Sequence, residues 1–254
     1  MGDTSDRDPG SPLRPPETFE IVLRTSQMLS PVVKELTFER ADGKVMHFEA
    51  GQWVNLLIPQ QEGEIKRANS IASAPGGHAR LQFAVTHVEG GPGSTYLHRM
   101  EVGDSLRAVG PQGLFVRRHG GPALFVGTGT GVTPLRSMFQ HALAQGETAP
   151  LWLLFGVRHE EDRIYEEELR ELAAGYPNFK VFYTLSQPKG GTWGGRTGYV
   201  QTHARALYEE MTALGQGDVH VYICGLQKMI GNVRDLLRKE MELPRQLVHS
   251  ERYD

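Results

Sequence analysis

The chain has 254 residues, of which 39% are hydrophobic and 22% charged, and its formal net charge is −3. This near balance predicts a globular protein without a basic surface for nucleic acid, and no apolar run approaches the roughly 20 residues of a membrane span. The one cysteine, Cys224, excludes an internal disulfide and any metal or iron–sulfur site built on several thiolates, so we expect no metal site and a cytoplasmic location.

The N-terminal half is predicted to be a tail followed by a β-domain. Residues 1–16 contain four prolines and no apolar core of a signal peptide, so a disordered tail is expected there. Residues 17–118 show short apolar or alternating runs, separated by Gly, Pro, Asn and Asp at intervals of roughly 10–15 residues, which predicts an antiparallel β-barrel or sandwich. Strands are expected over 19–25, 33–39, 53–59, 81–88 and 105–111, with one short helix over 94–100.

A different pattern begins after Gly120-Gly121-Pro122, the expected domain junction. Apolar runs now alternate with helical patterns, which predicts a doubly wound parallel sheet with helices over residues 119–254. The expected strands are 123–127, 151–156, 180–186 and 219–225, and the expected helices are 133–144, 164–174, 200–214 and 228–241.

A glycine-rich turn, GTGTGVTP over 127–134, links the first strand of this half to its first helix. Glycines let the backbone approach a pyrophosphate closely, and a helix N-terminus offers unpaired N–H groups and a partial positive charge. Such a turn is also common as a purely structural element, but this one opens the first unit of an α/β domain, where dinucleotides bind. Its candidate nucleotide contacts are Gly129, Thr130, Gly131 and Thr133.

Polar residues follow the other strands at the same predicted edge of the sheet. Arg158 follows the second strand, and Ser186 and Gln187 end the third, so they are candidates for the adenosine end of a dinucleotide. A solvated arginine is an equally common alternative for Arg158. Cys224 ends the fourth strand as either a buried small hydrophobe or a polar contact, and Gly225 after it lets a flat ring approach. No histidine adjoins Cys224 in the sequence, so nucleophilic catalysis by this thiol is not expected.

The stretch RANSIAS, residues 67–73, places an arginine and small polar residues at the end of a charged turn. Taken alone, Arg67 and Lys66 are most simply solvated turn charges. RANSIAS is followed in order by GGPGSTYL, GPQGLF, GTGTGVTPL, GVR, CG and the final ERYD. In this order and spacing of motifs, the chain resembles the ferredoxin–NAD(P) reductase superfamily from about residue 17 to the C-terminus.

The resemblance implies an FAD-binding barrel over 17–118 and an NAD(P)-binding domain over 119–254, whose C-terminal tail faces the flavin. It implies that Arg67 pairs with the FAD pyrophosphate, as guanidinium geometry favours, and that Ser70 lies beside the flavin N5 edge. Ser70, Cys224 and Glu251 are the implied catalytic set, which positions the nicotinamide and supplies protons. The FAD contacts implied are Arg67, Ala68, Asn69, Ser70, Gly93, Ser94, Thr95 and Tyr253, and the nucleotide contacts are Gly129, Thr130, Gly131, Thr133, Arg158, Ser186, Gln187, Arg196, Cys224 and Gly225.

Two positions depart from the family pattern. Asn69 stands where the family usually has a tyrosine that stacks on the flavin, and an amide offers no aromatic face of that area. Another side chain that covers the same face is the alternative explanation. Tyr253, the candidate for the other flavin face, is followed by Asp254 instead of ending the chain.

The resemblance predicts an FAD-dependent oxidoreductase that takes hydride from NAD(P)H and passes single electrons to a carrier such as ferredoxin or flavodoxin. A flavin reductase or the reductase component of an oxygenase is the alternative within this class. A nucleotide-binding module without flavin is the alternative outside it. Gln187 stands where NADPH-using relatives commonly have arginine, which favours NADH, whereas Arg158 and Arg196 remain available as phosphate ligands.

Overall fold

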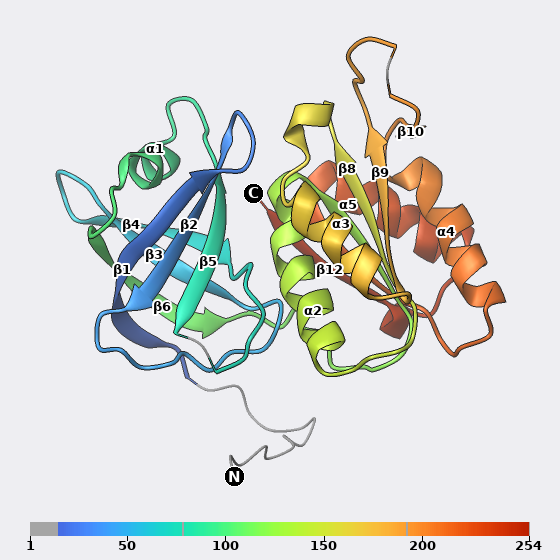
Figure 1. Ribbon diagram of the computed structural model, residues 1–254, viewed down its shortest axis with the longest axis horizontal. Coiled ribbons are helices and arrows are strands. Elements are labelled where there is room, and N and C mark those ends of the chain that lie inside the picture. The colour runs from blue at the N-terminus through green and yellow to red at the C-terminus, as the bar shows by residue number, and fades with distance from the viewer. Residues whose placement is uncertain (1–14, 78, 192, 254) are drawn as a thin grey trace.

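The structure is a computed structural model that describes residues 15–77, 79–191 and 193–253, so most of the tail predicted over 1–16 lies outside the described residues. Two six-stranded sheets lie side by side, an antiparallel one from the first half of the chain and a parallel one from the second (Figure 1). The predicted fold class is therefore confirmed. None of the helices within the described residues is long and apolar enough to cross a membrane.

The first sheet curls on itself in the strand order β4-β3-β6-β1-β2-β5. Its strands are β1 (Glu17–Met28), β2 (Val33–Arg40), β3 (Trp53–Pro59), β4 (Glu64–Ser70), β5 (Arg80–Thr86) and β6 (Ser105–Gln112). Inward-facing residues such as Ile21, Phe38 and Phe83 alternate with outward-facing ones and form the barrel core. One helix, α1 (Pro92–Arg99), joins β5 to β6, and its Leu97 is buried in the same core.

The second sheet is parallel, in the strand order β10-β9-β8-β7-β11-β12. Its strands are β7 (Ala123–Thr128), β8 (Leu151–Val157), β9 (Phe179–Leu185), β10 (Arg196–Thr197), β11 (His220–Leu226) and β12 (Val248–Tyr253). Its helices are α2 (Val132–Ala144), α3 (Glu166–Gly175), α4 (Gln201–Ala213) and α5 (Gln227–Asp235), with short helical turns η1 (Gly129–Gly131), η2 (Glu160–Asp162), η3 (Leu236–Glu240) and η4 (Arg245–Leu247).

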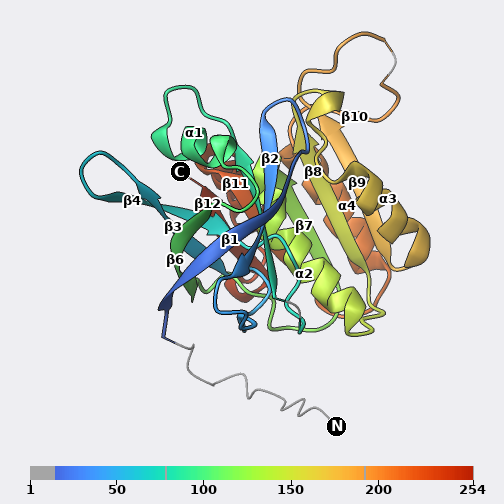
Figure 2. The same ribbon diagram turned by 60° about the vertical axis from the view of Figure 1, so that its left-hand side comes forward.

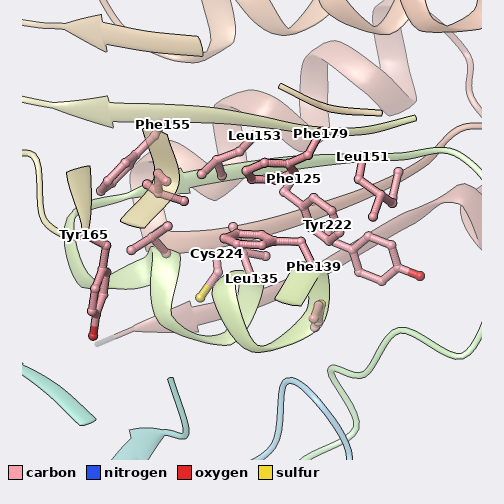
Figure 3. Close-up of a cluster of buried hydrophobic side chains, with 14 of the residues drawn as sticks. Phe125, Leu135, Phe139, Leu151, Leu153, Phe155, Tyr165, Phe179, Tyr222 and Cys224 are labelled. Carbon is pink, nitrogen blue, oxygen red and sulfur yellow. The ribbon is translucent and has the colours of Figure 1, made fainter. Parts of the chain in front are cut away.

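Helices cover both faces of the parallel sheet, α2 and α3 on one side and α4 and α5 on the other (Figures 1 and 2). The face under α2 and α3 packs a large apolar cluster, in which Figure 3 shows Phe125, Phe155 and Cys224 from the strands close to Leu135 of α2. Because central parallel strands are buried on both faces, β8 is apolar throughout and β7 is apolar up to its last residue, Thr128. Such apolar runs predict buried strands.

Two strands differ from the sequence-based expectation. The RANS residues, expected at the end of a charged turn, form the end of β4, and the C-terminal residues form the parallel edge strand β12 instead of a tail. Both strands lie at sheet edges, where most side chains stay exposed or only partly buried, so neither shows the alternation that predicts a strand. The helix expected over 228–241 is α-helical only to Asp235 and continues as the π-helical turn η3. The helix expected over 164–174 begins at Glu166, because Tyr165 adopts a left-handed conformation with φ 60°.

Helix α2 joins the two sheets through a buried arginine. Arg136 donates from Nη1 to the carbonyl oxygen of Ala72 at 2.7 Å and to Gln82 Oε1 at 3.0 Å, both in the barrel. It also pairs with Glu168 of α3, and its guanidinium lies 4.4 Å from the Tyr165 ring centre. The hydroxyl of Ser137 donates to the carbonyl oxygen of Ser73 at 2.8 Å. These contacts hold the end of the RANSIAS segment against the parallel sheet's first helix.

Candidate functional site

Arg67 and the start of α1 lie together on the barrel. Gly93 is buried, and a Cβ added there would lie 2.9 Å from Cγ and 3.1 Å from Nε of Arg67, so the arginine side chain crosses directly over this glycine. Arg67 itself is exposed, and its Nη1 donates to the neighbouring carbonyl oxygen of Lys66 at 2.9 Å. A guanidinium beside unpaired N–H groups at a helix N-terminus is a suitable arrangement for a phosphate or pyrophosphate.

Asn69 and Ser94 make local contacts. The Nδ2 of Asn69 donates to the carbonyl oxygen of Arg67 at 2.9 Å, so the amide stabilises the backbone of the strand end. Ser94 Oγ interacts with the backbone of Val88 and Gly91 and fixes the turn before α1. Ala68 is exposed on β4 and Thr95 is partly buried in α1. Asn69 stands where the family usually has a tyrosine, and its short side chain bonds the backbone of its own strand.

The glycine-rich turn forms η1 and leads into α2. Gly131 must be glycine, because a Cβ there would lie 2.4 Å from the carbonyl oxygen of Cys224, which shows how closely the turn approaches β11. Thr130 Oγ1 lies 3.4 Å from Thr86 Oγ1 of β5, so the turn also meets the barrel. The turn at residues 129–131 is therefore located between the two sheets.

The C-terminal strand brings Tyr253 to the junction between the sheets. Its hydroxyl donates to Ser70 Oγ at 2.6 Å and lies 2.9 Å from Thr133 Oγ1 of α2. It also interacts with the thiol of Cys224. Tyr253 therefore connects Ser70 of the barrel with Thr133 and Cys224, two of the candidate nucleotide contacts in the second half of the chain. Burial raises the pKa of its hydroxyl, so it stays protonated and able to donate.

Glu251 lies next to this group, opposite Cys224 in the β11–β12 pair. Its Oε2 is buried and has no hydrogen-bond partner among the described residues. Burial raises the pKa of the Glu251 carboxyl to about 7, and its hydrogen bond with Ser70 acts in the opposite direction. A carboxyl group with this pKa can hold or release a proton near neutral pH.

Cys224 is fully buried and belongs to the apolar cluster under α2. Burial, and secondly the nearby Glu251, raise the pKa of its thiol, so Cys224 is a neutral packing and contact group and not a nucleophile. Gly225 follows, and a Cβ there would lie 2.4 Å from Thr128 Oγ1, so only glycine fits against the β7 end.

The residues expected at the adenosine end lie at the ends of β8, β9 and β10. Arg158 and Gln187 are exposed and adjacent, since the Gln187 N–H donates to the carbonyl oxygen of Arg158 at 2.9 Å. The Arg196 guanidinium lies 4.7 Å from the ring centre of Phe182. Ser186 Oγ lies 3.4 Å from the carbonyl oxygen of Val157. Arg158, Ser186 and Gln187 thus lie together after β8 and β9, whereas Arg196 begins the edge strand β10.

The structure thus brings the predicted residues into three clusters. The first surrounds Arg67 on the barrel, the second surrounds Tyr253 between the two sheets, and the third lies at the strand ends near Arg158. Sequence reasoning missed Thr86 and Trp53. Thr86 touches the glycine-rich turn, and Trp53 lies beside Gly113 and Glu251. Neither belongs to a motif with a chemical signature, and their proximity to the site arises from strand pairing.

The chain is similar to known proteins over both halves. Residues 20–116 match the oxidoreductase FAD-binding domain family, and residues 125–235 match the oxidoreductase NAD-binding domain family. It is 57% identical over 241 residues to ferredoxin–NADP reductase B of Sorangium cellulosum, an alignment that covers 94% of this chain and 98% of that protein. The chain therefore belongs to the ferredoxin–NAD(P) reductase superfamily, and it is an FAD-dependent oxidoreductase that uses NAD(P)H.

Two further similarities describe the range of the family. The chain is 32% identical over 229 residues to the reductase component of phenol 2-monooxygenase from a Pseudomonas species, covering 89% of this chain but only 63% of that protein. Among solved structures, an Amycolatopsis cytochrome P450 reductase is 25% identical with a TM-score of 0.81, covering 98% of this chain and 73% of that one.

Proposed function

We propose that the protein passes electrons from NAD(P)H through bound FAD to a one-electron carrier protein of the ferredoxin or flavodoxin kind. The observation that carries this proposal is the contact of Tyr253 with Ser70 and Thr133, because it joins the flavin-side and nucleotide-side residues in one group. The name of the Sorangium relative, a ferredoxin–NADP reductase, supports a carrier protein as the partner. We further propose 17–118 as the FAD-binding domain and 119–254 as the nucleotide-binding domain.

The residues present fit FAD. The Arg67 side chain over Gly93 offers a cation and helix N–H groups to the pyrophosphate, and Ala68, Asn69, Ser94 and Thr95 border the same position. Oε2 of Glu251, which has no hydrogen-bond partner among the described residues, and the hydroxyl of Ser70 provide polar contacts for the flavin ring system. When bound, FAD supplies the redox chemistry, accepting two electrons from NAD(P)H and releasing them singly.

The protein's own residues have binding, positioning and proton-handling roles. The turn at 129–131 and Thr133 hold the nucleotide phosphates at the start of α2. Ser70, Cys224 and Gly225 position the nicotinamide once Tyr253 has moved from their side. Glu251 exchanges a proton through the Ser70 hydroxyl, which its near-neutral pKa allows.

The test is to purify the protein with FAD and record the flavin spectrum, its anaerobic bleaching by NADH and by NADPH, and the reduction of a ferredoxin and of a flavodoxin in separate assays. Flavin absorption, bleaching and carrier reduction are all expected. A chain that takes up no added FAD would overturn the proposal and favour a nucleotide-binding module instead. Reduction of free flavin with no carrier reduced would identify a flavin reductase.

A second candidate function is the reductase component of an oxygenase, which the similarity to the phenol 2-monooxygenase reductase component favours. These 254 residues have one cysteine, so a four-thiolate iron–sulfur cluster cannot be held by them, and the electrons would pass to a separate carrier. Copurification from native extract distinguishes the two functions, because an oxygenase component would accompany the protein only if the protein is the reductase component of an oxygenase.

A further inference from the structure

We propose that Trp53 is a positioning residue for Glu251, its indole ring forming the barrel-side wall that keeps water from the carboxyl group. This inference rests on the proposed function, in which Glu251 handles the proton of the reaction. It concerns a residue outside every motif by which the site was predicted, and it names what makes the environment of Glu251 apolar.

Strand pairing directs the indole toward the site. Trp53 is the first residue of β3 and pairs with Ser70 on β4 and with Gln112 on β6. Paired residues of adjacent strands point to the same face, so Trp53 leaves the sheet on the side of the Ser70 hydroxyl. The next residue, Val54, is fully buried in the barrel core on the opposite face. Trp53 therefore faces away from the barrel core and toward β12.

Gly113 shows how near the indole and the carboxyl group are. A Cβ added to Gly113 would lie 2.7 Å from Cδ1 and Nε1 of Trp53 and 3.8 Å from Oε1 of Glu251. The indole therefore packs against the Cα of Gly113, and the carboxyl group of Glu251 lies close to the same position. Gly113 has a φ of +105°, which side chains rarely adopt, so the residue that lets the ring pack this closely is a glycine.

Among the described residues, a hydroxyl, a thiol, a phenol and an arginine surround or adjoin Glu251. Ser70 from β4 donates a hydrogen bond, Cys224 from β11 and Tyr253 from β12 are neutral acids beside it, and the exposed Arg252 is its neighbour along the strand. The pKa of the carboxyl is raised by burial as the main cause. An aromatic wall against a carboxyl group produces such a rise, because it removes the water that would solvate the anion.

Two variants, Trp53→Gln and Trp53→Phe, distinguish shielding of the Glu251 carboxyl group from a purely structural role of the indole ring. Gln brings polar groups and water to the carboxyl group, whereas Phe keeps an apolar ring of nearly the same reach. Trp193→Gln is the matched control, because Trp193 is also partly buried but lies in the β9–β10 connection. Trp53→Leu, which keeps the site apolar but smaller, serves if the Gln variant fails to fold.

The measurement is an infrared pH titration of the protonated carboxyl band that Glu251→Gln removes, in the FAD-loaded protein and after FAD removal. We expect wild type and Trp53→Phe to titrate near neutral pH, and Trp53→Gln to titrate lower by about one unit or more, with a smaller fall for Trp53→Leu. Trp193→Gln should leave the titration unchanged. The pH profile of flavin reduction by NAD(P)H should shift in the same direction as the band.

A Trp53→Gln or Trp53→Leu protein that titrates as wild type does would overturn the proposal, as would a Trp53→Phe shift as large as that of Gln. The titration of the FAD-free protein keeps this result separate from the proposed function. If no FAD binds but the carboxyl titration shifts as expected, the proposed function fails and the role of Trp53 stands.

Discussion

At the scale of single residues, we predict that Arg67 is important for FAD binding and not for the stability of the fold. It is exposed, and its Nη1 donates to the carbonyl oxygen of its own neighbour, Lys66. We expect Arg67→Ala to weaken FAD binding by about 1.5–3 kcal/mol, the loss of a charge-assisted contact, with little change in the melting temperature of the FAD-free protein. Arg80→Ala, which removes an exposed arginine of β5, is the control. Equal FAD dissociation constants for the two variants, from flavin fluorescence, would contradict the assignment.

Gln187 decides the prediction of nucleotide preference. It is exposed beside Arg158, and a neutral amide offers no charge-assisted donor to a 2′-phosphate, so we predict that kcat/KM is higher with NADH than with NADPH. We expect Gln187→Arg to raise kcat/KM for NADPH by about tenfold or more, measured with ferricyanide. A tenfold NADPH preference of wild type would contradict the prediction and indicate Arg158 and Arg196 as phosphate ligands.

At the scale of elements, the strands buried on both faces could be predicted and the edge strands could not. The runs ALFVG and LWLLFG are apolar because β7 and β8 are central, whereas β4 and β12 carry polar residues. The site follows the same division: the glycine-rich turn and the RANS residues were recognisable as motifs. The position of Trp53 beside Glu251 depends on which strands pair, which no local pattern encodes.

The end of β12 occupies the place proposed for the nicotinamide. Tyr253 bonds Ser70 and Thr133 and contacts Cys224, so a ring that stacks there must first displace it. We expect removal of residues 253–254 to tighten nucleotide binding, because the displacement cost disappears while the remaining pairs of β11 and β12 persist. Calorimetric titration of the FAD-loaded protein with NAD⁺ and NADP⁺ measures this. Unaltered affinity together with an unaltered flavin spectrum would show that Tyr253 does not compete.

The opposite ends of β11 and β12 form a column of histidines. His220 Nδ1 lies 3.0 Å from His249 Nε2, and the His119 ring stacks on His220 with a centroid distance of 4.5 Å. Burial, then the neighbouring His220 and His119, lower the pKa of His249 to about 4, and burial also lowers that of His220. The folded state therefore binds fewer protons than the unfolded state, in which histidines have a pKa of about 6.5.

This column predicts an acid-sensitive stability. Since the folded pKa of His249 is depressed, its contribution is present above pH about 6.5 and is lost as the pH falls toward about 4. We expect His249→Gln to reduce the slope of unfolding free energy against pH in this window, measured by urea unfolding. His203→Gln, on the exposed side of α4, is the control. A wild-type slope in the His249 variant would contradict the prediction.

At the scale of the whole molecule, the site exists only while the two sheets are held together, and Arg136 is the principal polar link. It is 5% exposed and bonds Ala72 and Gln82 of the barrel and Glu168 of α3. Removing one partner of such a buried network leaves a carbonyl oxygen and a carboxylate without their cation. We therefore expect Arg136→Ala to lower the free energy of unfolding by about 3–5 kcal/mol. Arg170→Ala, which removes an exposed pair with Glu167, should lower it far less.

The form of the unfolding transition tests whether Arg136 acts on one sheet or on their association. If it holds the sheets together, urea unfolding of Arg136→Ala should separate into two transitions, because each sheet has an apolar cluster made only of its own half of the chain. Tryptophan emission and far-ultraviolet circular dichroism, recorded on the same samples, would then give different midpoints. The variant should also lose FAD more readily, since Ser70 and Tyr253 come from different sheets. Coincident midpoints and unchanged FAD affinity would restrict Arg136 to a local role within α2 and α3.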